Sequence, residues 1–318
     1  EGSLQQVIDT ALPGTTVVCD TKKQLEITAP LTIKKAITLK GLNARLPKKL
    51  GRTSLIVVEA RGVTLINITL HGNYDSVDQK DRAPLISIRK GNFRVEDCKF
   101  YDSSKDGVEV CPENRGDDIV GGTIRNIEAF RIGRDAVSIS GGNQGLRVRD
   151  VTVANISLKK GYLRGAVEVS DGTDNIRVRG VYAEACRYAI DVQDHRRQSA
   201  PNTNIGIEDV TAVNCGHIIR TDNSPRGHAT LTLRNFTAMS CTEPVRISNT
   251  KDVTIDGLKI VKHQSSQSPP ISLKNCQGVS LRNVTIETAH FINQPVRTKG
   301  CTDVRIKELK KTKLTVTN

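Results

Sequence analysis

One short phrase recurs along most of this chain, and this repeat limits the available folds more than any other feature. Close variants of GLRVRDVTVANI stand at 145–156, 176–186, 205–215, 230–241 and 278–289. In each, one Asn, Asp or Gly separates two runs rich in β-branched residues. Aligned on that residue, the copies give Asn67, Asp97, Asn126, Asp150, Gly180, Asp209, Asn235, Gly257 and Asn283. Successive members are 22 to 30 residues apart, which is typical of stacked-repeat folds.

The repeated unit predicts three short strands in each turn of a solenoid. Asn, Asp and Gly tolerate a positive φ angle, so one such residue can turn the chain sharply between two strands. Helix formers are sparse and aromatic residues make up only 3% of the chain, so the core must be aliphatic. Over about residues 30–310, the chain resembles the right-handed parallel β-helices of the pectate-lyase-like superfamily. This resemblance implies an all-β fold of about ten coils.

The two chain ends predict one domain, residues 1–318, that begins with a helix. Ser3 fits an N-cap, and the apolar face behind it comprises Leu4, Val7, Ile8 and Ala11. We expect a capping helix at 1–14, first coils at 15–61, regular coils at 62–310 and a tail at 311–318. Because the tail is rich in Lys and has no apolar helix, its charges can protect the last strand edge. An uncapped end also leaves end-to-end self-association as a prediction.

The formal net charge of +13 favours an anionic partner. The sequence contains no nucleic-acid-binding motif and no apolar run long enough to cross a membrane. We therefore expect an acidic polysaccharide, with no nucleic acid and no membrane insertion. The chain starts at Glu1, with neither Met nor a signal peptide before it. This start favours a processed mature protein that is secreted or displayed at the cell surface.

Eight cysteines leave two interpretations open. None forms a C-x-x-C pair, so a zinc site is not expected. Five of the eight lie in two alignment columns of the repeat. One column contains Cys186, Cys215 and Cys241, and the other contains Cys276 and Cys301. Stacked free thiols that act as small buried apolar groups are favoured over one or more disulfides.

The third strands of six coils align without gaps. Successive side chains of a strand point to opposite faces, so one residue in two points into the coil. The inward residues are Val108, Val137, Val167, Ile190, Ile219 and Val245. The outward column is then Glu109, Ser138, Glu168, Asp191, Arg220 and Arg246. Just before the strands lie a basic column, comprising Lys105, Arg134, Arg164 and Arg187, and a second column, comprising Asp106, Asp135, Gly165, Tyr188, His217 and Glu243.

These columns fit either a solvated ladder of ion pairs or a groove for a charged linear polymer. The longest loops favour the groove because they flank this face, at 71–84, 111–122, 157–164, 193–203 and 221–228. The segments KDGVEV (105–110) and RDAVSI (134–139) also resemble two motifs of polygalacturonase-type glycoside hydrolases. That resemblance implies that Asp106 and Asp135 are catalytic acids. However, Arg134 replaces one acid of the family, Arg164 replaces its His, and no R-I-K segment follows.

These departures favour a polysaccharide lyase over a hydrolase. A lyase needs cations to neutralise a uronate carboxylate, a base to remove the C5 proton and an acid for the leaving oxygen. The candidate bases are Lys105, an Arg or His217, and the candidate acid is Tyr188. The segment YAIDVQDH (188–195) also resembles the Y-G-x-D-P-H segment of alginate C5-epimerases, with Tyr188 and Asp191 matched.

The sequence therefore predicts an enzyme that acts on an acidic polysaccharide, most favourably a lyase. The alternatives are a glycoside hydrolase and a non-catalytic fibre, adhesin or surface protein. The predicted catalytic residues are Asp106, Asp135, Asp191, Tyr188, Arg164 and His217. The predicted substrate-binding residues are Lys105, Arg134, Arg187, Asp194, His195, Arg197, Arg220 and Arg246. No cofactor is required by this prediction, although Glu168 and Asp191 are adjacent and offer oxygen ligands to Ca²⁺.

Overall fold

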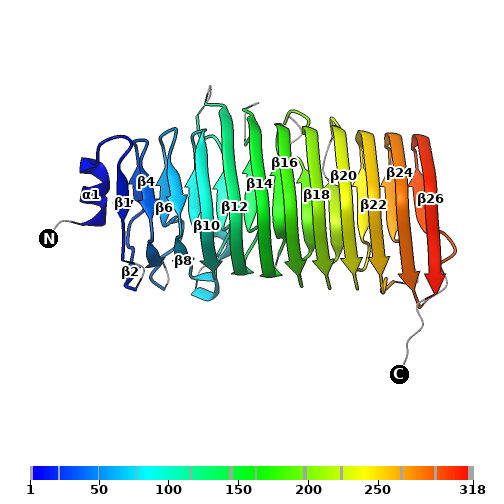
Figure 1. The fold of residues 1–318 in the computed structure, drawn as a ribbon, viewed down its shortest axis with the longest axis horizontal. Coiled ribbons are helices and arrows are strands. Elements are labelled where there is room, and N and C mark those ends of the chain that lie inside the picture. Colours follow the sequence, from blue (N-terminus) through cyan, green and yellow to red (C-terminus); the bar gives the residue numbers. More distant parts are fainter. Residues whose placement is uncertain are drawn as a thin grey trace.

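The chain forms a rod with its two ends far apart (Figure 1). A computed structural model describes residues 3–20, 22–48, 50–76, 78–114, 117–142, 146–161, 163–195, 199–222, 225–265, 268–289 and 292–313. The fold is the expected right-handed parallel β-helix. Helix α1 (Leu4–Thr10) covers one end of the rod, and strand β26 (Thr302–Lys313) forms the other. The described residues contain no helix with the length and apolar character that a membrane span requires.

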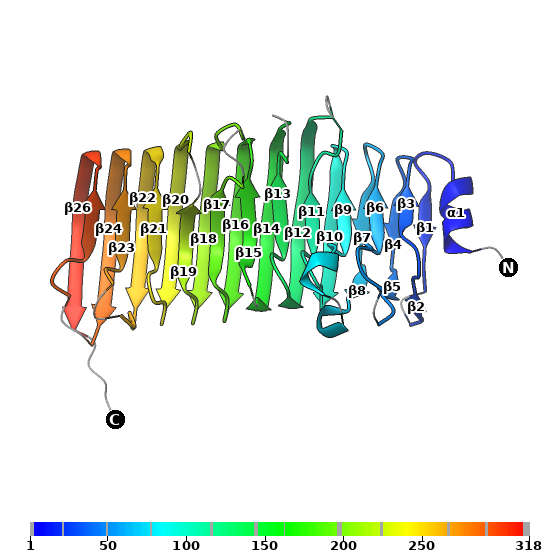
Figure 2. The ribbon, with the colours of Figure 1, turned by 180° about the vertical axis from the view of Figure 1, so that it is seen from behind.

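Two parallel sheets make up the wall of the rod, and Figures 1 and 2 show them from opposite sides. The 15-stranded sheet comprises β1 (Thr16–Val18), β2 (Gln24–Glu26), β4 (Thr38–Lys40), β5 (Asn43–Arg45), β7 (Thr64–Ile66), β8 (Thr69–His71), β10 (Phe93–Tyr101), β12 (Ile119–Ile132), β14 (Val148–Gly161), β16 (Thr173–Glu184), β18 (Thr203–Val213), β20 (His228–Met239), β22 (Thr250–Val261), β24 (Gln277–Thr288) and β26. The 11-stranded sheet comprises β3 (Leu31–Ile33), β6 (Ile56–Val58), β9 (Ile86–Ile88), β11 (Val108–Val110), β13 (Val137–Ser140), β15 (Gly165–Ser170), β17 (Tyr188–Gln193), β19 (His217–Asp222), β21 (Val245–Ser248), β23 (Ile271–Lys274) and β25 (Val296–Lys299).

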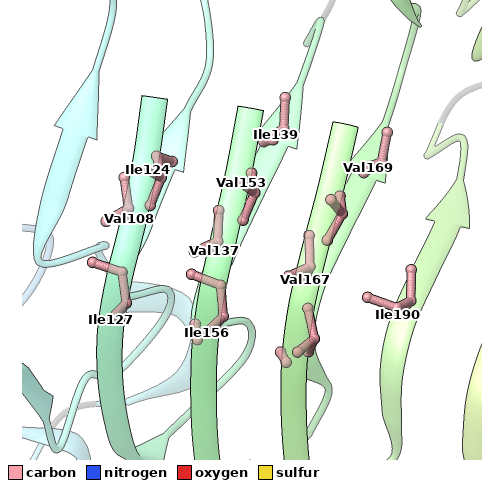
Figure 3. Close-up of a cluster of buried hydrophobic side chains, with 14 of the residues drawn as sticks. Val108, Ile124, Ile127, Val137, Ile139, Val153, Ile156, Val167, Val169 and Ile190 are labelled. Atoms are coloured by element: carbon pink, nitrogen blue, oxygen red, sulfur yellow. The ribbon is translucent and has the colours of Figure 1, made fainter. Parts of the chain in front are cut away.

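The strand register of the 11-stranded sheet confirms the alignment of the third strands. Val108 pairs with Val137, Val137 with Val167, and Val167 with Ile190. Their side chains point into the rod and stack on those of the 15-stranded sheet, as Figure 3 shows. Burial of each such Val or Ile contributes roughly 1.5–3 kcal/mol, so each turn is held mainly by aliphatic contact with its neighbours.

The corner residues have positive φ angles, but one was assigned to the wrong column. Asn126 pairs in register with Asn155, whose φ is 55°, so Asn155 rather than Asp150 is the corner of that turn. Asp150, with φ 58°, belongs to a second column of residues with a left-handed backbone conformation. Its neighbours in that column, on the adjacent turns, are Gly121 and Asn175. The prediction failed because the two columns are five residues apart and accept the same residue types. In the true corner column, the Asn155 side-chain amide donates to Asn126 Oδ1 at 2.9 Å.

Helix α1 begins at the predicted cap. The Ser3 side chain accepts a hydrogen bond from the Gln6 backbone, and the Gln6 side chain bonds back to the Ser3 backbone. Ile8 is buried against the first coil, whereas Val7 is 46% exposed, so the apolar face is narrower than expected. Helices η1 (Tyr74–Ser76) and η2 (Gln79–Asp81) lie within the long loop at 71–84, at one edge of the rod (Figure 2).

All eight cysteines are free thiols, as the favoured interpretation expected. Cys186, Cys215 and Cys241 are buried on successive turns. The Cys215 thiol donates to the carbonyl of Ala183 at 3.5 Å, and that of Cys241 to Ala212 at 3.7 Å. The column therefore fills the core in the way that small apolar side chains do.

Candidate functional site

The predicted basic column lines a cleft at the N-terminal ends of four strands of the 11-stranded sheet. Lys105, Arg134, Arg164 and Arg187 stand shortly before β11, β13, β15 and β17, and the register of these strands brings the four side chains into a row. The cleft encloses about 460 Å³, and Leu163 and Arg82 complete its lining. Arg82 was not predicted because it lies in the loop at 71–84, outside the repeat, where no alignment could place it.

The outward column has the predicted register but not the predicted exposure. Ser138, Glu168 and Asp191 follow one another on adjacent strands, and Arg220 comes next. All four are buried, and Glu168 and Asp191 are 0% exposed. Side chains from neighbouring turns cover this part of the sheet, so a simple solvated ladder is wrong for these positions. Glu109 and Arg246, at the two ends of the column, keep some exposure.

The two predicted catalytic acids are also buried, and each connects its turn to the next. Asp106 Oδ1 accepts the backbone N–H of Asp135 at 3.1 Å, and Asp135 Oδ1 accepts that of Gly165 at 3.2 Å. Lys105 Nζ lies 3.7 Å from Asp106 Oδ2, on the side of the cleft. Burial raises the pKa of Asp106, although the charges of Arg134 and Lys105 oppose this effect. The acids therefore lie beneath the cations that line the cleft.

Tyr188 is buried beneath the cleft and reaches across an entire turn. Its hydroxyl donates to Asp135 Oδ1 at 2.9 Å, although Tyr188 and Asp135 are two turns apart. Gly165 occupies the turn between them and leaves room for the ring. A Cβ atom at position 165 would lie 1.8 Å from the Tyr188 carbonyl oxygen and 2.5 Å from a ring carbon. Tyr188 thus holds Asp135 in place rather than facing the cleft.

The buried carboxyl groups of Asp135 and Glu168 influence each other's protonation. Burial, the charge of Glu168 and a hydrogen bond between the two carboxyl groups raise the pKa of Asp135 well above its usual value. Burial alone would also raise the pKa of Glu168, but hydrogen bonds from His195 and Asp135 outweigh it and hold that pKa well below its usual value. The two pKa values move in opposite directions, so Asp135 is protonated in preference to Glu168.

Glu168 is the centre of the charged network. Its Oε2 lies 2.7 Å from Arg164 Nη1 and 3.3 Å from Arg134 Nη2. Its Oε1 accepts a hydrogen bond of 2.9 Å from the Gln193 amide and lies 3.1 Å from His195 Nε2. Glu168 therefore orients two of the arginines that line the cleft. The sequence placed Glu168 in a metal site, and its contacts indicate a different role.

His195 extends this network to the surface. Its Nδ1 lies 2.7 Å from Asp171 Oδ2, and its backbone N–H donates to Asp171 Oδ1 at the same distance. The hydrogen bonds to Asp171 and Glu168 raise the pKa of His195 to about 9. The imidazole is therefore protonated at neutral pH. Sequence reasoning missed Asp171 because its only signal was a short acidic turn, DG, after β15.

Asp191 is paired with Arg220 and does not fit the proposed calcium site. The guanidinium of Arg220 donates to both carboxylate oxygens of Asp191, with Nε 3.0 Å from Oδ1, and it stacks over the Tyr188 ring at 4.9 Å. Since Arg and His side chains already contact Glu168, Ca²⁺ would have to displace several cations. The described residues contain no cluster of three or more His, Cys, Asp or Glu suited to a metal ion.

His217 lies one turn beyond Tyr188, among cations. Burial and the charges of Arg220, Arg246 and Arg187 lower its pKa to about 4, so the imidazole is neutral at pH 7. Its Nδ1 lies 2.6 Å from the carbonyl oxygen of Glu243 and must donate to it. The lone pair is consequently on Nε2. A neutral imidazole can accept a proton while the exposed Arg187 and Arg246 bind an anion.

Three further predicted residues have different surroundings. Asp194 is buried, where its Oδ1 accepts the Asp171 backbone N–H at 3.2 Å and the Asn202 amide at 2.9 Å. It supports the loop behind His195 and does not face the cleft. Arg246 is exposed one strand beyond Arg220, on β21. Arg197 lies outside the described residues.

Comparisons with known proteins identify the fold. No protein-family model and no curated protein sequence matches the chain. A family 28 exopolygalacturonase of Yersinia enterocolitica superposes with TM-score 0.67 at 12% identity, over 96% of this chain and 74% of the enzyme. The A-module of the Azotobacter vinelandii mannuronan C-5 epimerase AlgE4 gives 0.61 at 14% identity, over 99% and 95%. The N-terminal fragment of bacteriophage phi29 gene product 12 gives 0.56 at 13% identity, over 95% and 63%. Identities this low establish a shared fold alone.

Proposed function

We propose that this chain binds an acidic polysaccharide in the basic cleft and cleaves it by β-elimination outside the cell or at its surface. The observation that carries the proposal is the lining of the cleft, where five of six side chains are cationic. A guanidinium matches a carboxylate or sulfate in shape and charge, and buried Glu168 holds Arg134 and Arg164 in position for such a contact. The shared fold of an exopolygalacturonase and a mannuronan epimerase also supports a polysaccharide ligand.

His217 is the proposed base. A uronate carboxylate bound by Arg164 and Arg187 loses part of its negative charge, which makes the C5 proton more acidic. His217 Nε2 takes that proton, the electron pair forms a C4–C5 double bond, and the C4–O bond breaks. Water protonates the departing oxygen. A bound anion also opposes the effect of the arginines on His217 and raises its pKa from about 4 towards neutrality, where a base is most effective.

Hydrolysis is the second candidate, and one observation favours it. The raised pKa of Asp135 favours its protonated form, which is the form that a general acid needs. Elimination is preferred because Asp106, Asp135 and Glu168 all lie beneath the cations, with 0% exposure. An inverting hydrolase needs one carboxyl group on each side of the bond that it cleaves.

Product analysis tests the proposal. The protein is incubated with polygalacturonate, alginate, hyaluronan and heparin, and the ultraviolet absorbance of an unsaturated uronate and new reducing ends are followed together. Both signals are expected with at least one polymer, and reducing ends alone would establish hydrolysis. His217→Gln is expected to abolish the absorbance while binding persists, and Arg305→Ala, on the last strand, serves as the matched control. Binding without any product would contradict an enzymatic role and favour a structural one.

A further inference from the structure

A second hollow lies next to the basic cleft. It encloses about 300 Å³, and Gln24, Lys48, His71, Tyr74, Asp75 and Arg131 are among the residues that line it. Two observations connect the hollow to the cleft. Arg131, which lines the hollow, is followed three residues later by Arg134, which lines the cleft. Arg82, which also lines the cleft, stacks over the Tyr74 ring of the hollow at 5.7 Å. One extended polymer can therefore contact both.

The wall of this second hollow includes carboxylates as well as cations, whereas the charged side chains that line the cleft are all cations. Arg131 forms ion pairs with Asp75, at 3.0 Å, and with Asp102. Arg45, also on the wall, pairs with Glu26 at 2.9 Å. A wall that contains carboxylates, guanidinium groups and the Gln24 amide can donate hydrogen bonds to hydroxyl groups and accept hydrogen bonds from them. It offers little net attraction to an anion.

The hollow also contains an aromatic surface in a chain that has few aromatic residues. The whole sequence has five Tyr, five Phe and no Trp. Tyr74 lines the hollow, and Tyr101 stacks behind His71 with ring centroids 4.8 Å apart and an interplanar angle of 15°. Burial lowers the pKa of His71, although Asp102 opposes this effect. The His71 ring is consequently neutral at pH 7. Neutral rings beside hydroxyl-binding groups suit the face of an uncharged sugar.

We infer that the hollow binds an uncharged sugar unit of the same polymer whose acidic unit occupies the basic cleft. The substrate class is then an acidic heteropolysaccharide, in which neutral and charged sugars are neighbours along the chain or at a branch. This inference rests on the proposed function, because the cleft fixes the position of the charged unit.

Binding measurements with four polymers test the inference. Polygalacturonate contains only uronate, whereas hyaluronan, chondroitin and gellan place neutral sugars beside each uronate. The wild-type protein is expected to bind at least one mixed polymer about tenfold more tightly than polygalacturonate. Tyr74→Ala should remove that preference, which is measured as the ratio of the two affinities because Tyr74 also contacts Arg82 of the cleft. Gln24→Ala, which changes a lining residue outside the loop at 71–84, should also weaken the preference.

The results separate a failure of the inference from a failure of the proposed function. If Tyr74→Ala and Gln24→Ala change no affinity, or change the affinities for all four polymers equally, the inference that the hollow binds a neutral sugar is wrong. If Arg164→Ala also leaves every affinity unchanged, the basic cleft itself is not the binding site. Tyr182→Ala, on the 15-stranded sheet away from both hollows, serves as the control, and each variant's melting temperature verifies that it is folded.

Discussion

The Tyr188 hydroxyl donates a hydrogen bond of 2.9 Å to Asp135, a residue two turns away along the rod. This contact crosses the turn that contains Gly165. It connects the buried acids with the Arg220–Asp191 pair, because Arg220 stacks on the Tyr188 ring. The charged groups under the cleft therefore form one continuous network from Asp171 to Arg220.

Loss of the Tyr188 hydroxyl should destabilise the fold. Tyr188→Phe removes one of the two hydrogen bonds that the buried Asp135 Oδ1 accepts and leaves only that from the Gly165 N–H, so we expect the free energy of unfolding to fall by about 1–3 kcal/mol. Urea unfolding measures the change. Tyr182→Phe is the matched control, because Tyr182 donates to Glu184 at a partly exposed site, and about 0.5 kcal/mol or less is expected there. Equal losses in the two variants would contradict the role given to Tyr188.

A methyl group at position 165 should be far more harmful than one at position 206. In Gly165→Ala, the new Cβ would lie 1.8 Å from a backbone oxygen of the next turn, so turns must separate, at a cost of about 3 kcal/mol or more. In Gly206→Ala, the nearest atom is the Arg177 Cδ at 3.1 Å, which can move aside. Melting temperatures of the two variants compare the sites. Similar melting temperatures would mean that Tyr188 does not need the space above Gly165.

Removal of the central charge should break the network. Glu168→Gln leaves Arg134 and Arg164 without their buried carboxylate partner, and we expect a loss of about 3–5 kcal/mol. Glu128→Gln provides the comparison, since the pair between Glu128 and Lys99 is exposed and contributes about 0.5 kcal/mol or less. Denaturant unfolding of both variants distinguishes a buried network from a surface ladder. A small loss for Glu168→Gln would favour the ladder.

The stability that His195 supplies should decline as pH rises. Its pKa is about 9 in the folded chain and near 6.5 otherwise, so its contribution is complete below about pH 6.5 and is lost as pH approaches and passes 9. Because the side chain is 35% exposed, solvent screening reduces the full effect to about 1–2 kcal/mol. The stability difference between the wild type and His195→Gln, measured from pH 5 to pH 10, should shrink over this range. A difference that stays constant or grows would contradict the assignment.

Chelation should leave the protein unchanged. Arg220 contacts both oxygens of Asp191, and Arg134, Arg164 and His195 contact Glu168, so these carboxylates are not arranged for Ca²⁺. We expect neither EDTA nor added Ca²⁺ to alter the melting temperature or the rate of product formation. A rise in melting temperature with Ca²⁺ that Asp191→Asn abolishes would restore the calcium site.

Sequence reasoning succeeded where it depended on spacing. The alignment alone predicts the column of stacked inward residues from Val108 to Val245 and the row of cations from Lys105 to Arg187. It failed where two positions accept the same residues, as with Asp150 and Asn155, and where a contact lies outside the repeat, as with Arg82. The hydrogen bond between Tyr188 and Asp135 could not be found either, because it joins turns that no alignment column connects.

The sequence by itself determined the solenoid and which residues share a row, because a repeated spacing fixes the register of parallel strands and a period of two fixes the side of each strand. Only the tertiary structure decided that Glu168, Asp191 and Arg220 are buried although they point outward. Burial depends on which long side chains and loops of neighbouring turns cover a position. That depends on packing in three dimensions, and no pattern within a single turn records it.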